Sequence, residues 1–170
     1  WAGGAAMLTG AALFAGFHCN ELLMKLLARG DPHPLLFDAY AQTLPELAGA
    51  DDAKGQAALR AFELLLLREI GLLPDLSLVT ATQRALREDE RFALRPDAGV
   101  APAGAGDAGL PGAVLIGAQA ALELGSMAAL REVCAAALPG FKTTLRTLLA
   151  YHLGTPTLRT RQVMLDLQLL

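Results

Sequence analysis

The residues whose types and spacing best fit a binding task lie between residues 53 and 70. Arg60 and Arg68 flank Leu64 and Leu67 in a segment whose other apolar positions recur every three or four residues. A guanidinium group binds a carboxylate through two parallel hydrogen bonds, and neighbouring leucines can bury an apolar side chain. The pattern predicts a groove for a peptide end that is both acidic and hydrophobic. The alternative is a central helix buried on two sides, with the arginine stems packed over apolar surface.

A second candidate binding surface arises from uneven charge near the end of the sequence. The stretch between Glu132 and Asp166 contains no acidic residue. Its cations are Lys142, Arg146, Arg159 and Arg161. The first two share a helical face, and the last two would begin a helix, where positive charge opposes the helix dipole. Two interpretations remain, a surface that contacts DNA phosphates weakly and in a salt-sensitive way, or an ordinary solvated face.

No motif typical of an enzyme or a metal site is present. Residues 104–109 match the spacing of the dinucleotide-binding glycine motif, but they lie in a Gly- and Ala-rich run instead of between a strand and a helix. His18 and Glu21 share a helical face, yet this pair alone makes no site, and His18 is interpreted as a structural histidine. Cys19 and Cys134 are expected to be buried, reduced thiols. We therefore predict no enzyme activity, no cofactor and no metal.

Bulk composition limits the class of protein. The 170 residues are 54% hydrophobic and 18% charged, which is enough for a sizeable core and excludes a chain disordered throughout. Aromatic residues make up only 5%, so the core must consist of leucine and alanine, both strong helix formers. The net charge of −3 argues mildly against nucleic-acid binding by this chain alone. Residues 1–17 fit neither a signal peptide nor a membrane span, so no membrane association is expected.

Helical sequence must position the candidate residues. In the first half, helices are predicted over residues 5–28, 35–48 and 53–70. The prolines of Asp31–Pro34 separate the first two, and Gly71 ends the third. In the second half, helices are predicted over residues 127–138, 141–153 and 158–169.

The region between these halves, residues 74–116, differs in composition. Arg91-Phe92-Ala93-Leu94-Arg95 alternates briefly in the manner of a short strand. Residues 98–113 are almost entirely Ala, Gly and Pro, and we predict a flexible loop there because ordering glycine costs much backbone entropy. Residues 1–170 are therefore expected to form one mainly α, helical bundle-like domain with a small irregular or β excursion near residues 74–116.

Four segments, in order, resemble characteristic segments of RecO proteins, a family of DNA recombination and repair mediators. Residues 15–23, AGFHCNELL, are similar to the family's "x-G-x-Y-x-N-E-L-L" helix, and residues 31–40, DPHPLLFDAY, to the stretch that follows it. Residues 59–67, LRAFELLLL, resemble its "L-R-x-F-E-x-x-L-L" helix. The sequence from Leu153-Gly154 to Arg161 resembles its closing "L-G…L-[KR]-[ST]-R".

The resemblance implies a function by binding. RecO proteins carry an N-terminal OB-fold, which is absent from this chain and would supply much of the contact with single- and double-stranded DNA. The family anneals single strands, cooperates with RecR in recombinase loading, and engages the acidic, hydrophobic C-terminal tail of single-stranded DNA-binding protein. By resemblance, Arg60 corresponds to a tail-binding arginine. Many members bind zinc through four cysteines, but residues 74–116 contain none, so no zinc is expected. A cytoplasmic, nucleoid-associated bacterial protein is also implied.

Two classes of function follow from these observations. The first is a non-enzymatic recombination mediator that binds DNA and protein partners. The second is a helical protein-interaction scaffold with no nucleic-acid role, in which the basic stretch is ordinary surface. Salt-dependent binding to single-stranded DNA would separate the two classes.

Overall fold

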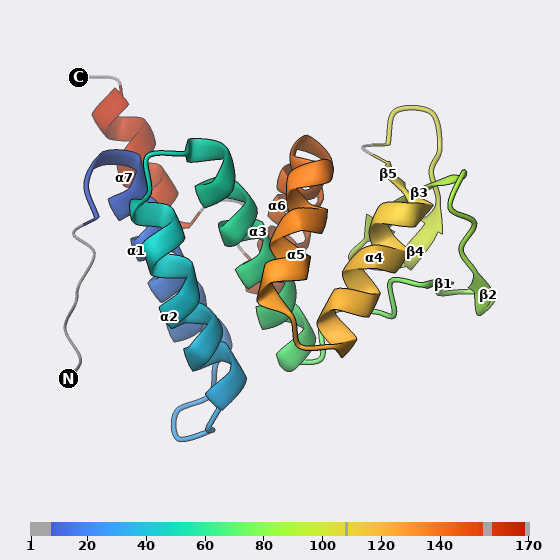
Figure 1. Ribbon diagram of the computed structural model, residues 1–170, viewed down its shortest axis with the longest axis horizontal. Helices are drawn as coiled ribbons and strands as arrows, with labels where there is room; N and C mark the ends of the chain where they lie inside the picture. Colours follow the sequence, from blue (N-terminus) through green and yellow to red (C-terminus); the bar gives the residue numbers. More distant parts are fainter. Residues whose placement is uncertain (1–7, 108, 155–157, 169–170) are drawn as a thin grey trace.

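A computed structural model describes residues 8–107, 109–154 and 158–168, with helices over most of the molecule and small antiparallel sheets at one end (Figure 1). The mainly α architecture with a small β excursion is therefore confirmed. The elements in chain order are α1 (Gly10–Leu26), α2 (Pro34–Ala48), α3 (Asp52–Glu69), β1 (Leu78–Val79), β2 (Arg84–Ala85), β3 (Arg91–Arg95), β4 (Gly99–Pro102), β5 (Leu110–Pro111), α4 (Gly112–Glu123), α5 (Met127–Ala136), α6 (Leu138–Leu153) and α7 (Arg159–Gln168).

The helix α3 lies in the interior because its sequence is apolar on nearly all sides. Asp51 caps its N-terminus by accepting a hydrogen bond from the Lys54 backbone N–H at 3.1 Å. Gly71, with φ at +74°, follows its last turn in the left-handed conformation that often ends a helix. Every residue from Ala57 to Leu67 is buried, and α1, α2, α5 and α6 all contact the helix. The alternative expectation of a central, buried helix is confirmed.

The helices α1 and α2 form a hairpin that packs against α3 (Figure 1). Pro34 takes the first helical position of α2, where its missing N–H would have no intrahelical partner anyway. The Tyr40 hydroxyl donates to Asn20 Oδ1 at 2.7 Å and joins the two helices. Residues 5–7 of the predicted first helix lie outside the described residues. The part of the hairpin that matters for the site is the α1 face toward α3, α6 and α7.

Both ends of the Gly- and Ala-rich segment form strands that we did not predict, β4 and β5, whereas residues 103–107 and 109 between them have loop or turn structure. The strand predicted over Arg91–Arg95 is confirmed as β3, and both β4 and β5 pair antiparallel with it. Val100 and Leu110, the large apolar side chains of the segment, are 0% and 1% exposed and anchor it to the core. The sequence did not indicate these strands because strand pairing satisfies backbone groups through partners that lie outside the segment.

The second half contains one helix more than we predicted. The helix α4 begins at Gly112, inside the predicted loop. Glycine suits this position because the Cβ atom of any other residue would lie only 2.0 Å from the Arg87 carbonyl oxygen. The helix α6 begins with Pro139 in its first turn and ends before Gly154, whose φ is +63°. The turn residues 155–157 and the predicted helix end at residue 169 lie outside the described residues. No helix in the described ranges has the length and apolar character needed to cross a bilayer.

Candidate functional site

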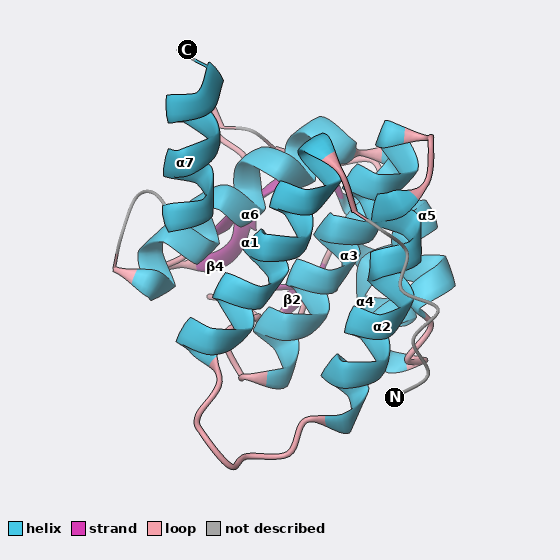
Figure 2. Cartoon of the chain, turned by 90° about the vertical axis from the view of Figure 1, so that its left-hand side faces the viewer, coloured by secondary structure: helices cyan, strands magenta, loops and turns pink. Residues whose placement is uncertain are grey.

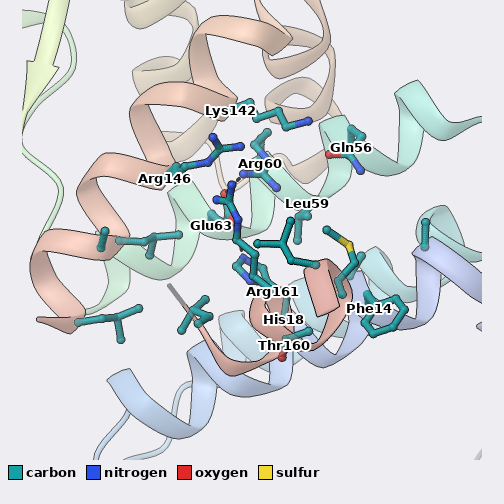
Figure 3. A pocket seen from close by; sticks show the side chains of 18 residues that line it. Phe14, His18, Gln56, Leu59, Arg60, Glu63, Lys142, Arg146, Thr160 and Arg161 are labelled. Atoms are coloured by element: carbon teal, nitrogen blue, oxygen red, sulfur yellow. Dashed lines mark hydrogen bonds and ion pairs between the residues drawn. The ribbon is translucent and has the colours of Figure 1, made fainter. Parts of the chain in front are cut away.

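A pocket of about 280 Å³ opens between α1, α3, α6 and α7 (Figure 3). Much of its wall is apolar, including Phe14, Leu59, Leu149, Leu153, Met164 and Leu165. Its ionisable side chains are His18, Arg60, Glu63, Lys142, Arg146 and Arg161. We refer to this site as the cationic pocket. A largely apolar cavity with a few converging polar groups is typical of a ligand-binding site.

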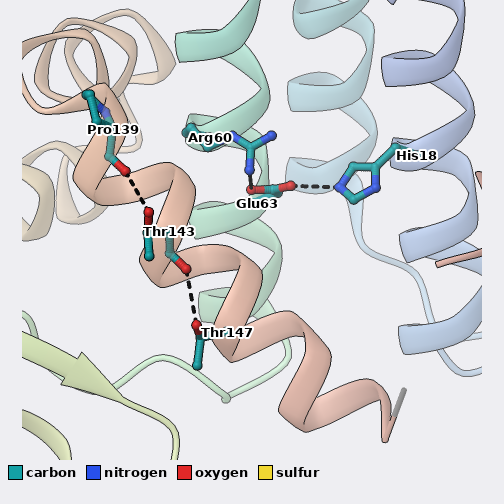
Figure 4. Close-up of polar contacts among 6 residues, drawn as sticks. All are labelled: His18, Arg60, Glu63, Pro139, Thr143 and Thr147. Atoms are coloured by element: carbon teal, nitrogen blue, oxygen red, sulfur yellow. Dashed lines mark hydrogen bonds and ion pairs between the residues drawn. The ribbon is translucent and has the colours of Figure 1, made fainter. Parts of the chain in front are cut away.

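One side of the cationic pocket rests on a buried ionic network centred on Glu63 (Figure 4). Glu63 Oε2 lies 2.9 Å from Arg60 Nη1, and Glu63 Oε1 lies 2.7 Å from His18 Nε2. The Glu63 side chain is 0% exposed and that of Arg60 is 9% exposed. A carboxylate at this depth is costly unless it is paired, so both partners are needed to hold it. The network thereby fixes Arg60 and His18 in place, and it agrees with the structural role expected for His18.

Three further cations surround Arg60 from the helices opposite. Lys142 and Arg146 come from α6 and are exposed, whereas Arg161 comes from α7 and is half-buried (Figure 3). Burial and the positive charges of Arg161 and Arg60 lower the pKa of Arg146, while Glu63 acts in the opposite direction. Four cations against one acid give the pocket a formal charge of +3 when His18 is neutral. Because these like charges repel one another, the pocket favours an anionic ligand.

The polar side chains that α6 contributes to the cationic pocket are Lys142 and Arg146. The hydroxyls of Thr143 and Thr147 on the same helix donate to the Pro139 and Thr143 carbonyl oxygens at 3.1 and 3.2 Å (Figure 4). Such bonds from a threonine to the preceding turn satisfy the hydroxyl within its own helix. Neither threonine lines the cationic pocket.

Two thiols lie near the network and are chemically inert. Burial, followed by the negative charge of Glu63, raises the pKa of Cys19 and of Cys134 to about 12. Thiols with so high a pKa are protonated at neutral pH, so they are neither good nucleophiles nor good metal ligands. The expectation that both are buried and free is confirmed. Across the residues that the structure describes, His, Cys, Asp and Glu side chains form no group suited to a metal ion.

The structure combines parts of the two predicted sites. Arg60 was assigned to a peptide groove, and Lys142, Arg146 and Arg161 to a DNA-binding surface, but all four line the cationic pocket. Arg159 is exposed and is not among the lining residues. The residues therefore converge from stretches that are about 80 to 100 positions apart in the sequence.

The structure does not bring Leu64, Leu67 and Arg68 into one groove with Arg60. Both leucine side chains are 0% exposed because neighbouring helices cover α3 on these sides, so they cannot contact a partner in this fold. Arg68 lies in a different depression, of about 330 Å³, between α2, the end of α3 and the turn from α4 to α5. We refer to it as the acidic groove, because Arg68 is accompanied there by Asp38, Glu69 and Glu123.

Glu21 has a role at the pocket that was not predicted. Its carboxylate accepts hydrogen bonds from the Arg159 and Thr160 backbone N–H groups, both at 2.9 Å, and from the Thr160 hydroxyl at 2.7 Å. Partial burial raises the pKa of Glu21, but these hydrogen bonds and one from Lys25 outweigh it and lower the pKa to about 2. No spacing rule connects positions so far apart in the chain. The one indication in the sequence that Glu21 matters was its place in residues 15–23, the segment that resembles a characteristic RecO helix.

Comparisons with known proteins indicate one family over nearly the whole chain. A family model described as "Recombination protein O C terminal" matches residues 7–162. The chain is 49% identical over 179 residues to the DNA repair protein RecO of Variovorax paradoxus, a match that covers 100% of the chain and 70% of that protein. The DNA repair protein RecO of Verminephrobacter eiseniae is 48% identical over 172 residues, covering 100% of the chain and 68% of that protein. The family match includes Arg60, Lys142, Arg146 and Arg161.

Proposed function

The chain belongs to the RecO family of DNA repair proteins, and we propose from this premise that it is a recombination mediator that acts by binding and not by covalent chemistry. Family membership establishes the role in DNA repair and recombination. The finer proposal is that the cationic pocket receives the acidic, hydrophobic C-terminal tail of single-stranded DNA-binding protein. Such an attachment would hold the mediator beside single strands, where annealing and recombinase loading take place.

The observation that carries this proposal is the combination of four cations with an apolar cavity. A peptide end of this kind carries acidic side chains, a terminal carboxylate and an apolar terminal side chain. The exposed Lys142 and Arg146 can meet the acidic side chains at the rim of the pocket. Arg60, deeper and held by Glu63, is suited to a carboxylate that enters further, because a guanidinium group binds a carboxylate bidentately. Leu149, Leu153 and the other apolar walls can bury the terminal side chain.

The experiment is a titration of the protein with a labelled peptide ending in Asp-Asp-Ile-Pro-Phe, followed by fluorescence anisotropy. We expect a dissociation constant in the micromolar range and a loss of at least tenfold in affinity for Arg146→Glu, because a repulsive charge replaces an attractive one. Arg146 is exposed, so this variant is expected to fold. Arg60→Glu is less informative, since it would place a second acid beside the buried Glu63.

The matched control is Arg29→Glu, the same charge reversal at an exposed residue outside the pocket. A peptide with both aspartates replaced by asparagine is the control for the ligand. Equal affinity of Arg146→Glu and Arg29→Glu, with both proteins folded, would contradict the proposed pocket.

DNA is the second proposed ligand of these cations, and RecR a further partner that the family relation suggests. Lys142, Arg146 and Arg159 are exposed and can approach phosphates, whereas an acidic chain with net charge −3 limits the affinity. If about four phosphates are neutralised, the logarithm of the single-stranded DNA binding constant falls with the logarithm of salt concentration with a slope of roughly −3. A slope near zero, or no binding at low salt, would instead favour a scaffold with no nucleic-acid role of its own.

A further inference from the structure

The helix α7 forms one wall of the cationic pocket but has few contacts of its own. It contributes Thr160, Arg161, Met164 and Leu165 to the lining. Its main packing partner is α1, and it lies at the edge of the molecule with its C-terminal end projecting beyond the other helices (Figure 2). Val163 and Leu167 are 51% and 53% exposed, so little apolar burial holds the helix in place. Some other interaction must fix the position of this wall.

Glu21 on α1 supplies that interaction. Its two carboxylate oxygens together accept three hydrogen bonds from the first turn of α7, two from the backbone N–H groups of Arg159 and Thr160 and one from the Thr160 hydroxyl. The backbone N–H groups at a helix N-terminus have no partner within the helix, and a carboxylate there also interacts favourably with the helix dipole. Lys25, one turn further along α1, lies 3.1 Å from the same carboxylate.

The same carboxylate explains how α7 can begin with two arginines. Positive charges at a helix N-terminus oppose the helix dipole, and Arg159 and Arg161 both lie in the first turn. The negative charge of Glu21 at this end offsets that cost. Arg161 can then point into the pocket, close enough to Arg146 for its charge to lower the Arg146 pKa.

We infer that Glu21 is a positioning residue for ligand binding, which clasps the N-terminus of α7 and thereby holds Arg161 in the cationic pocket. The inference rests on the proposed function for the ligand, but the clasp itself does not depend on any ligand. When Glu21 is replaced, α7 leaves α1 for part of the time, and only the docked fraction of molecules has a complete pocket. The apparent affinity for an acidic peptide falls in proportion to that fraction.

The first part of the test is hydrogen exchange of the protein without ligand. We expect faster exchange of the α7 amides in Glu21→Gln than in the wild type, with unchanged exchange in α3. Glu132→Gln, the same change at an exposed acid on α5, is the matched control and should leave α7 unaffected. Unchanged α7 exchange in Glu21→Gln would overturn the clasp, whatever the peptide does.

The second part is a double-mutant cycle with the Asp-Asp-Ile-Pro-Phe peptide. We expect Glu21→Gln to weaken binding about fivefold to tenfold, and Glu21→Asp, which keeps the charge, to recover part of that loss. In an Arg161→Ala background the effect of Glu21→Gln should shrink to about twofold or less, because the side chain that the clasp positions is gone. Additive losses would show that Glu21 does not act through Arg161.

The two parts separate failure of the inference from failure of the proposed function. Wild-type protein that does not bind the peptide, but loses α7 protection in Glu21→Gln, would contradict the peptide ligand and leave the clasp in place. Wild-type protein that binds the peptide, with Glu21→Gln binding equally well, would contradict the positioning role.

Discussion

Arg60 and Arg68 lie on the same helix, two turns or about 12 Å apart along its axis, yet their surroundings have opposite charge. Around Arg60, α6 and α7 add three cations, and the cationic pocket has a formal charge of +3. Around Arg68, α2 and the ends of α3 and α4 add three acids, and the acidic groove has a formal charge of −2. An acidic peptide is attracted to the first site and repelled by the second.

Cavity size does not distinguish the two sites. Their volumes are similar, about 330 Å³ for the acidic groove and about 280 Å³ for the cationic pocket. Both have apolar side chains in their walls. What distinguishes them is the sign of the charge that neighbouring helices contribute, and this sign depends on tertiary packing.

The largest effect is expected from breaking the buried pair beneath the cationic pocket. Arg60→Ala leaves the fully buried Glu63 carboxylate without its cation, so the free energy of unfolding should fall by about 3–5 kcal/mol. Arg60→Met combined with Glu63→Met removes both charges and should recover most of that stability without restoring peptide affinity. Chemical denaturation measures the first effect and peptide titration the second. Full peptide affinity in the double variant would show that Arg60 is only structural.

The next effect separates the core side of α3 from its pocket side. Leu64→Ala creates a cavity at a fully buried position and should lower the free energy of unfolding by about 2–5 kcal/mol. The peptide affinity of the folded protein should change less than twofold. Denaturation and titration of the same preparation measure both quantities. A large loss of affinity with unchanged stability would restore the groove that the sequence predicted along α3.

A smaller effect compares the two sites directly. Arg146→Ala should weaken peptide binding about tenfold, or about 1.4 kcal/mol, and reduce its dependence on salt. Arg68→Ala should change the affinity less than twofold, because Arg68 lies in the acidic groove. Isothermal titration calorimetry at two salt concentrations measures both variants. A greater loss for Arg68→Ala than for Arg146→Ala would reverse the assignment of the two sites.

The smallest effect concerns pH. The pKa of Glu21 is lowered in the folded protein from its ordinary value of 4.5 to about 2, so its ionised form stabilises the fold. This stabilisation is fully present above about pH 4.5 and is lost as the pH falls towards 2. We therefore expect wild type to be more stable than Glu21→Gln by about 1 kcal/mol at pH 7, with a difference that shrinks over that window. Denaturation at pH 7, 4 and 3 measures it; a constant difference would contradict the role of the Glu21 charge.

Local features of the fold could be predicted from the sequence. The range predicted for α3 differs from the observed one by a single residue at each end, because Asp51 and Gly71 are strong local signals for where a helix begins and ends. The strand Arg91–Arg95 was correct for a similar reason, since its short apolar run between two arginines is visible within five residues. Both features depend on neighbours in the chain.

Features that depend on distant contacts could not be predicted. Composition suggested a loop over residues 98–113, but pairing with β3 forms strands at Gly99–Pro102 and Leu110–Pro111, where Val100 and Leu110 are buried. The apolar residues of α3 could be recognised, but not which of them other helices cover. Likewise, Arg60 and Lys142 were assigned to separate sites, because only the packing of α6 against α3 brings them together. The bond from Glu21 to Thr160 spans 139 positions and has no local signature.

The most direct test is hydrogen exchange of the protein with and without a saturating amount of the tail peptide. Binding in the cationic pocket predicts slower exchange in α1, α6 and α7, with no change in α2 or in the turn between α4 and α5. Slower exchange confined to α2 and that turn would place the ligand in the acidic groove and contradict the assignment of the cationic pocket as the partner site.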